Sequence, residues 1–279
     1  MLDTEAKIKS VRDLGARHYL LTLYTPEQAR LARPGQFVML KCADSPRELP
    51  LLRRPFSIFN IDRQARTGRP SGLELLVKDV GTGTRKLVQY RPGQRIRCLG
   101  PLGRGFQISP AMRNRTPAVC LVAGGIGIAP IFMLAQGFKA QNIRPVLFYG
   151  GATAADLVLR DRFEHLEIDI VCTTEDGSLG ERGIVTQPLA RFLKTQSRKN
   201  TRLYACGPWG MMKAVHEQAV QNDLPCEVSL EARMGCALGA CLGCVIRSRD
   251  PNGEEQYIRV CQEGPVMDSR LVDWNTVPI

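Results

Sequence analysis

The chain has 279 residues and a formal net charge of +11, and the charge is unevenly distributed. Residues 1–115 hold 22 lysines and arginines against 9 acidic residues, whereas the rest of the chain is nearly neutral. The basic residues are spread out and lack the interleaved aromatics of a stacking platform, which argues against a nucleic-acid partner. No apolar run reaches the roughly 18–20 residues of a membrane span. The N-terminus lacks the apolar core of a signal peptide, so we expect a cytoplasmic protein with no membrane span.

Short apolar segments separated by turns fill residues 5–100, among them HYLLTLYT, GQFVMLKC, FSIFNI, LELLVKDV and QRIRCLG. Their β-branched and aromatic content is typical of strands, and Pro-Gly pairs at Pro34–Gly35 and Pro92–Gly93 separate them. The sequence therefore predicts a small antiparallel β-barrel domain over residues 1–102.

The pattern changes after residue 103. A buried-strand run from Ala118 to Ala123 meets a glycine turn, and helical apolar spacing follows from Ile131 to Phe138. Further strand-like runs alternate with helical stretches near residues 155–165, 184–195 and 209–221, which predicts a parallel-sheet α/β domain over 103–224. Residues 225–279 are too few for a large core, and we expect this small module to depend on a metal centre.

Three glycine-containing or basic stretches are candidate cofactor loops. AGGIGIAP, with Gly124, Gly125 and Gly127, lies between a strand and a helix, where a pyrophosphate can approach bare backbone. RRPFSIF offers an arginine and a hydroxyl at a strand start, and KDVGTGTRKL offers a second glycine turn. Each motif alone is also compatible with a packing turn or a basic turn.

In order along the chain, the motifs R-P-x-S, G-T-G-T, G-P-x-G-x-x-F, G-G-I-G-x-A-P and YACGP resemble the ferredoxin-NADP reductase superfamily over residues 1 to about 220. The resemblance implies an FAD-binding barrel and a nicotinamide-binding α/β domain. The residues that it implies for FAD are Arg54, Pro55, Phe56, Ser57, Leu76, Val77, Lys78, Gly83 and Thr84. Those that it implies for NAD are Gly124, Gly125, Gly127, Cys206, Gly207 and Pro208.

Residues 234–244, MGCALGACLGC, place Cys236, Cys241 and Cys244 in the C-x4-C-x2-C spacing of plant-type [2Fe–2S] proteins, and Cys261 supplies the fourth thiolate. The small residues between them leave room for backbone amides around cluster sulfurs. Zinc is the competing metal, although structural zinc sites favour two short pairs of ligands. The spare Cys226 is expected to be structural. Four further cysteines are expected to pack as small hydrophobes, namely Cys42, Cys98, Cys120 and Cys172.

The ending SLEARMGCALGACLGCV with RVCQEGPV resembles the electron-transfer subunits of NAD-dependent dihydroorotate dehydrogenases over essentially the whole chain. The resemblance implies an oxidoreductase subunit of pyrimidine biosynthesis in a hetero-oligomer. An FMN-containing catalytic subunit would oxidise dihydroorotate to orotate, and electrons would pass through the [2Fe–2S] cluster and FAD to NAD⁺. Two departures stand out: Ala237 replaces an expected glycine, and the loop that leads to Cys261 is long.

Asp156, in the loop after the second α/β strand, favours NAD over NADP. No catalytic acid or base is expected, because none of the three histidines lies in a motif. Two other functions remain open. The chain could be the sister subunit of a sulfide dehydrogenase or of a ferredoxin:NADP transhydrogenase, or a non-enzymatic interaction module with a zinc-stabilised tail.

Overall fold

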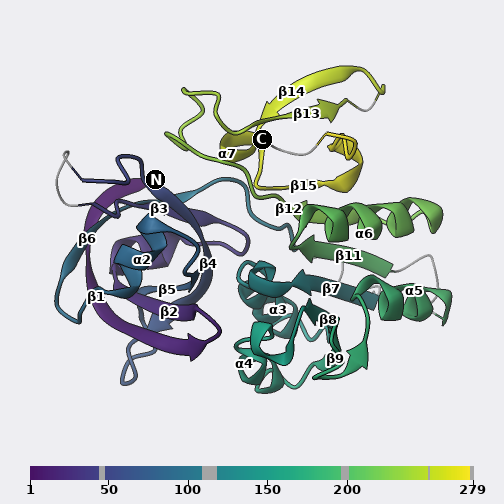
Figure 1. The fold of residues 1–279 in the computed structure, drawn as a ribbon, viewed down its shortest axis with the longest axis horizontal. Helices are drawn as coiled ribbons and strands as arrows, with labels where there is room; N and C mark the ends of the chain where they lie inside the picture. Colours follow the sequence, from purple (N-terminus) through teal and green to yellow (C-terminus); the bar gives the residue numbers. More distant parts are fainter. Residues whose placement is uncertain (44–47, 109–117, 196–200, 251, 277–279) are drawn as a thin grey trace.

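The computed structural model describes residues 1–43, 48–108, 118–195, 201–250 and 252–276. A closed β-barrel forms the N-terminal part, and a seven-stranded, mostly parallel sheet follows it. Figure 1 shows the barrel on the left, the sheet with its helices on the right, and a small two-stranded hairpin above them. The predicted fold class, an antiparallel barrel plus a parallel-sheet domain and a small C-terminal module, is confirmed.

Six antiparallel strands close the barrel in the order β1-β2-β5-β4-β3-β6. Alternate side chains point inward along each strand, and Ile8, Leu21, Ile58 and Leu75 are at most 1% exposed. Burial of this apolar face drives closure of the barrel. The barrel elements are β1 (Leu2–Gly15), β2 (His18–Tyr24), α1 (Pro26–Leu31), β3 (Phe37–Leu40), β4 (Arg54–Arg63), β5 (Pro70–Lys78), α2 (Thr82–Val88) and β6 (Arg95–Leu102).

β1, the longest strand of the barrel, was not predicted from the sequence. Of its side chains only Ala6 and Ile8 are buried, so its apolar periodicity is weak. The strand is held instead by its neighbours, because it pairs with β2 along one edge and with β6 along the other. A polar segment thus becomes a strand through long-range pairing that local sequence does not reveal.

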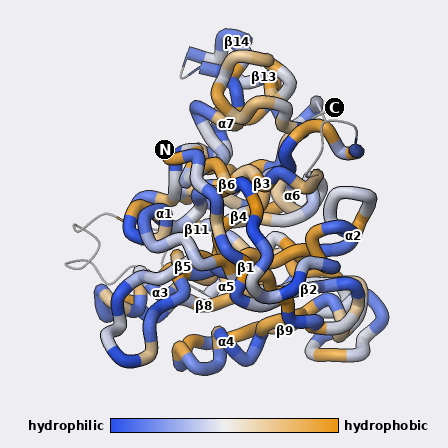
Figure 2. Tube along the Cα trace, turned by 90° about the vertical axis from the view of Figure 1, so that its left-hand side faces the viewer, coloured by the Kyte–Doolittle hydropathy of each residue, from blue (hydrophilic) through white to orange (hydrophobic). Residues whose placement is uncertain are grey.

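The second sheet has the order β10-β9-β8-β7-β11-β12-β15, and every neighbouring pair is parallel except β12 with β15. Its central strands are covered on both faces, which explains their continuous apolar runs. Figure 2 shows hydrophobic segments along strands of the barrel and of the sheet domain. The strands are β7 (Ala118–Gly124), β8 (Val146–Gly151), β9 (Asp169–Thr174), β10 (Glu181–Arg182), β11 (Thr201–Cys206), β12 (Cys226–Ser229) and β15 (Val266–Asp268).

Helices cover both faces of this sheet. They are η2 (Gly125–Ile128), α3 (Ile131–Lys139), η3 (Ala154–Asp156), α4 (Arg160–Glu164), α5 (Thr186–Thr195) and α6 (Trp209–Gln221). The helix predicted near 155–165 is broken, because Leu159 adopts a left-handed φ of 58° between η3 and α4. No helix in the described part of the chain is long and apolar enough to cross a membrane.

The C-terminal segment leaves the sheet after β12 and returns to it as β15. Between them lie the cysteine loop, the hairpin β13 (Val245–Arg249) and β14 (Glu255–Arg259), and the short helix α7 (Val260–Glu263); η5 (Ser269–Leu271) follows β15. Two strands of the sheet therefore come from residues beyond 224. The predicted domain boundaries at 102 and 224 stay predictions.

The barrel and the sheet domain are joined by an aromatic stack and two ion pairs. Phe59 of β4 lies parallel to Phe132 of α3, with ring centroids 4.6 Å apart, and Phe132 meets Phe163 edge-on. Arg162 of α4 pairs with Glu74 of β5 at 2.9 Å. The second ion pair joins Lys78 of β5 to Asp156 of η3 at 3.2 Å. Both pairs are partly exposed and contribute about 0–1 kcal/mol each, so the buried aromatic contact dominates.

We expect Phe59→Ala to lower the free energy of unfolding by about 3–5 kcal/mol, because it removes a fully buried ring from this contact. Tyr257→Ala, at a side chain that is 67% exposed, should change it by less than about 0.5 kcal/mol. Denaturant unfolding followed by circular dichroism measures both. Equal effects of the two variants would contradict this account of the interface.

Candidate functional site

A cavity of about 370 Å³ lies where the barrel, the start of the sheet domain and the C-terminal segment meet. Seven of the residues predicted to contact FAD line it: Arg54, Pro55, Phe56, Ser57, Leu76, Lys78 and Thr84. The same cavity is also lined by residues that the sequence did not single out, namely Phe37, Val80, Ile126, Ala129, Leu230, Glu231, Ala232, Met234 and Pro265. Four of these come from the SLEARM stretch that leads from β12 to Cys236, from which the sequence analysis drew the family resemblance but no contact with FAD.

A second cavity, of about 610 Å³, adjoins the first and shares Arg54, Val80 and Thr84 with it. Gly83 lines this second cavity, and a Cβ atom there would lie 3.3 Å from Cγ of Arg54. The Thr84 hydroxyl accepts hydrogen bonds from the backbone N–H groups of Val80 and Gly81. The two predicted motifs therefore meet in space, at the boundary of the two cavities. Val77 differs, since its side chain is buried in the barrel core.

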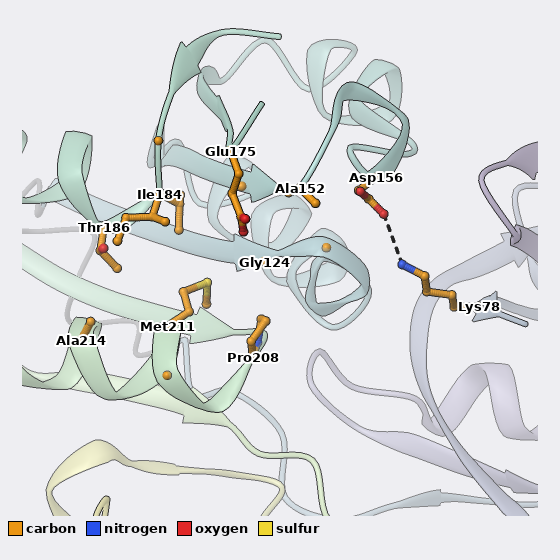
Figure 3. A pocket seen from close by; sticks show the side chains of 16 residues that line it. Lys78, Gly124, Ala152, Asp156, Glu175, Ile184, Thr186, Pro208, Met211 and Ala214 are labelled. Carbon is orange, nitrogen blue, oxygen red and sulfur yellow. Dashed lines mark hydrogen bonds and ion pairs between the residues drawn. The ribbon is translucent and has the colours of Figure 1, made fainter. Parts of the chain in front are cut away.

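A third cavity, of about 510 Å³, lies at the carboxyl ends of the parallel strands, where open α/β sheets bind ligands. Gly124, Gly125 and Pro208 line it, as predicted residues of the nicotinamide site. Figure 3 shows this cavity with Glu175 pointing into it and Met211 on the opposite wall.

The other three residues predicted for the nicotinamide site do not line this cavity but pack against residues next to it. They are Gly127, Cys206 and Gly207. A Cβ atom on Gly127 would lie 2.3 Å from the carbonyl oxygen of Cys206. One on Gly207 would lie 2.9 Å from the backbone nitrogen of Gly124. Cys206 itself is buried, and burial raises the pKa of its thiol. Glycine is therefore needed for the close approach of the loop after β7 to the loop after β11.

Lys78 lies at the junction of two cavities, because it lines both the 370 Å³ and the 510 Å³ cavity. Its ammonium group pairs with Asp156 at 3.2 Å, which links the barrel to the sheet domain (Figure 3). Burial is the largest single effect and raises the pKa of Asp156, but the interactions with Lys78 and Thr153 together lower it by more. The pKa of Asp156 therefore lies below its usual value. The carboxylate from which we predicted NAD preference thus already has a partner.

Glu175 is a second carboxylate in the 510 Å³ cavity, and the sequence analysis did not identify it. It follows directly on β9, and within the described residues its carboxylate makes no hydrogen bond or ion pair. The signal was available in principle, since an acidic residue at the end of a parallel strand is a common ribose ligand.

The four predicted metal ligands form two pairs. Cys236 and Cys241 lie at the surface, and the N–H of each points to the sulfur of the other at 3.4 Å. The N–H of Leu238 also donates to Cys236 Sγ, and this bond is the largest of those that lower the pKa of Cys236 to about 6. Cys244 and Cys261 lie below them, at 3% and 1% exposure, where burial and the neighbouring thiol raise the pKa of Cys261 to about 12.

This arrangement fits a dinuclear cluster better than zinc. No group of three or more His, Cys, Asp or Glu side chains within the described ranges could hold a single metal ion. A structural zinc site needs four ligands around one ion, whereas each iron of a [2Fe–2S] cluster takes two protein ligands. A Cβ atom on Gly235 would lie 3.2 Å from Cys241 Sγ, so a bare backbone leaves space beside this thiol.

Ala237 has a φ of +58° and is buried. This conformation favours glycine, which is the residue that we expected from the family pattern, and alanine there costs about 1–2 kcal/mol. The backbone keeps the turn regardless, and it still directs the N–H of Leu238 to Cys236.

Two family models match the chain. One, the iron–sulfur cluster binding domain of dihydroorotate dehydrogenase B, covers residues 231–273, and an oxidoreductase NAD-binding domain covers residues 121–217. The electron transfer subunit of dihydroorotate dehydrogenase B (NAD(+)) from Desulforamulus reducens is 38% identical over 97% of this chain and 98% of its own length. The chain belongs to this family.

Electron transfer subunits of dihydroorotate dehydrogenase B from two other organisms are also similar to this chain over nearly its whole length. That of Caldanaerobacter subterraneus is 34% identical over 94% of this chain and 95% of its own length, and that of Geobacillus thermodenitrificans is 37% identical over 93% and 94%. The predicted resemblance to this family is confirmed, and so are the iron–sulfur and NAD-binding domains. The chain is therefore an oxidoreductase subunit, which acts with a catalytic partner.

Solved structures extend the comparison. A chain from the NADH-dependent reduced ferredoxin-NADP oxidoreductase superposes with a TM-score of 0.81 at 26% identity, over 97% of this chain and 90% of that chain. A ferredoxin NADP⁺ reductase from Neisseria gonorrhoeae with bound FAD and NADP gives 0.65 at 19% identity, over 78% and 91%. The second likeness shows that the two chains share a fold.

Gly127→Ala should lower the free energy of unfolding by about 1–3 kcal/mol, because its Cβ would overlap the Cys206 carbonyl. The control is Gly210→Ala in the first turn of α6, where a Cβ meets nothing within 4 Å. That variant should be as stable as the parent or slightly more so. Thermal unfolding of both proteins decides, and equal midpoints would contradict the close packing of the two loops.

Proposed function

We propose that this chain holds FAD, a [2Fe–2S] cluster and NAD in three adjoining sites, and passes to NAD⁺ the electrons that a partner subunit takes from dihydroorotate. One observation carries the proposal: the 370 Å³ cavity shares Lys78 with the nicotinamide cavity and Met234 with the start of the cysteine motif. When bound, FAD and the cluster supply redox chemistry that joins one-electron donors to a hydride acceptor.

The barrel residues would hold FAD across the two connected cavities. Arg54 lies at their boundary, where its guanidinium can neutralise a diphosphate. It donates to the backbone carbonyls of Leu52 and Arg53, which fixes its direction. Phe56 and Leu76 supply apolar wall to a flat ring in the 370 Å³ cavity, and Ser57 a hydroxyl.

The loop after β7 would receive the NAD pyrophosphate. Gly124 and Gly125 leave its backbone bare, and the loop begins the short helix η2. The Lys78–Asp156 ion pair stands between this cavity and the flavin cavity, so it holds the two domains in register where a nicotinamide must meet a flavin.

The cysteine loop would face the partner. Cys241 is exposed, and so are Leu238 and Leu242, at 45% and 61%. Exposed apolar residues beside a cluster suit a protein that docks there. The partner that we propose is an FMN-containing catalytic subunit in a hetero-oligomer, and the predicted cytoplasmic location stays a prediction.

A second candidate function is that of the corresponding subunit of a ferredoxin–NADP oxidoreductase, which the 26% likeness over 97% of the chain favours. Co-purification separates the two candidates. The proposal predicts a complex with an FMN-containing subunit that reduces NAD⁺ when dihydroorotate is added. A partner that contains iron–sulfur clusters and an NADP site, with no response to dihydroorotate, would support the second function.

Cys241→Ser should abolish or destabilise the cluster, because serine is a poor substitute for a thiolate ligand. Reduction of bound FAD by NADH should continue, since neither cavity that we assign to FAD contains Cys241. Electron paramagnetic resonance and stopped-flow absorbance provide the two measurements. Cys172→Ser, at a half-buried cysteine outside the motif, is the control and should keep both. Loss of flavin reduction together with the cluster would contradict the separation of the two sites.

Glu175→Gln should weaken discrimination against NADPH, because a carboxylate repels a 2′-phosphate and accepts hydrogen bonds from a ribose hydroxyl. We expect kcat/KM for flavin reduction by NADPH to rise about 10-fold, and that for NADH to fall. Asp176→Asn is the control, since Asp176 bonds Ser178 and does not line the cavity. An unchanged NADH-to-NADPH ratio in Glu175→Gln would remove Glu175 from the nicotinamide site.

A further inference from the structure

Arg259 lies beside the buried pair of predicted cluster ligands, and the sequence analysis gave it no role. It directly precedes α7, the short helix that carries Cys261. In the register of the β13–β14 hairpin it lies opposite Val245, which directly follows Cys244. The next residue, Val260, donates its backbone N–H to the carbonyl of Cys244 at 3.1 Å. The side chain of Arg259 therefore starts from the backbone that holds both buried ligands.

Glu263 holds the guanidinium of Arg259 in one direction. Nη2 of Arg259 donates to Oε1 of Glu263 at 2.7 Å, while Nε lies 3.4 Å from Oε2. A guanidinium that meets a carboxylate at two points is fixed in orientation as well as in distance. The remaining nitrogen, Nη1, donates to the backbone carbonyl of Gly239 at 3.3 Å, in the loop between Cys236 and Cys241. One side chain thus joins the surface pair of cysteines to the buried pair.

The cysteine loop touches α7 at this same residue. Gly239 has a φ of +78°, and a Cβ atom there would lie 2.7 Å from Cγ of Gln262 and 3.3 Å from Nη1 of Arg259. Glycine suits both the left-handed backbone and the close approach. The bond between Arg259 and the Gly239 carbonyl therefore closes a contact that the backbone is shaped to make.

The peptide group that Arg259 holds has a second end. In a planar trans peptide the C=O and the N–H point in opposite directions, so a Gly239 carbonyl directed at Arg259 turns the N–H of Ala240 away from it. That N–H contributes, after the larger effect of Leu238, to the backbone hydrogen bonds that lower the pKa of Cys236 to about 6. The bond on one side of the peptide thus directs a donor towards a predicted ligand on the other side.

Donors aimed at ligand sulfur stabilise the extra negative charge of a reduced cluster, and such bonds help to set its reduction potential. We propose that Arg259 is a positioning residue of the [2Fe–2S] site: it holds the Gly239–Ala240 peptide with its N–H towards the first cysteine ligand, and thereby raises the reduction potential of the cluster. This rests on the proposed function, in which the four cysteines hold that cluster.

The test is an anaerobic redox titration of the purified, cofactor-loaded chain, in which electron paramagnetic resonance follows the reduced cluster. Arg259→Gln should lower the potential by about 30 mV or more, equivalent to about 3-fold in the one-electron equilibrium. Glu263→Gln keeps one acceptor oxygen for the guanidinium, so it should lower the potential by less. Arg259→Gln should also lose iron to a chelator about 10-fold faster than the parent. NADH should reduce the FAD of both variants at the parent's rate.

Arg249→Gln is the matched control. Arg249 lies on the same hairpin, and its side chain is 47% exposed, against 42% for Arg259. It also contacts a carboxylate and a backbone carbonyl, those of Glu255 and Gly253, but its carbonyl partner lies between β13 and β14. This variant should keep the potential and the iron retention of the parent.

An unchanged potential in Arg259→Gln would overturn the proposal even if iron were lost faster, since a merely structural role would explain that loss. A higher potential in Glu263→Gln would also overturn it, because charge rather than position would then determine the potential. If Arg259→Gln keeps too little cluster to titrate, Glu263→Gln decides alone, and an unchanged potential there contradicts the proposal. A parent without the signal of a [2Fe–2S] cluster would instead refute the proposed function.

Discussion

The return of the C-terminal segment to the sheet is the constraint on which the arrangement of sites depends. β12 and β15 pair antiparallel, so residues 230–265 form an excursion whose two ends are held together. The N–H of Leu230 donates to the Pro265 carbonyl at 2.9 Å, and the N–H of Arg104 donates to the Gly264 carbonyl at 2.6 Å. The exit of the barrel, the edge of the sheet and both ends of the cysteine module are thus joined by backbone hydrogen bonds, which place the cysteine loop beside the 370 Å³ cavity that we assign to FAD.

The contact between barrel and sheet domain complements this backbone anchor. Its buried part is the Phe59–Phe132 stack, and its polar part is a pair of salt bridges of opposite polarity. Lys78 belongs to the barrel and Asp156 to the sheet domain, whereas Glu74 and Arg162 reverse the order. Two salt bridges of this kind add little stability at the surface, but they fix the register of the barrel against the sheet domain. For hydride transfer, register decides the outcome, because reacting atoms must come within about 3–3.5 Å.

Much of this was accessible from sequence, for physical reasons that differ by element. Strands such as β2 and β7 carry strong apolar patterns, and the glycine and cysteine motifs mark places where only certain residue types fit. The polar strand β1 escaped prediction because pairing on both edges determines it. The joining of β12 and β15 to the sheet also escaped, because it rests on pairing between segments far apart in the sequence. Glu175 and Glu231 are single acidic residues whose neighbours come from distant segments, so no local pattern distinguishes them from solvated glutamates.

In the function that we propose, flavin and cluster exchange electrons within this one chain, in the absence of any partner. The most direct measurement is an anaerobic titration of the isolated chain with NADH, with flavin absorbance and the electron paramagnetic resonance signal of the reduced cluster followed together. A route that carries electrons from cluster to NAD⁺ also carries them back, so NADH in excess should bleach the flavin and produce the cluster signal. A bleached flavin beside a cluster that only dithionite can reduce would contradict the account.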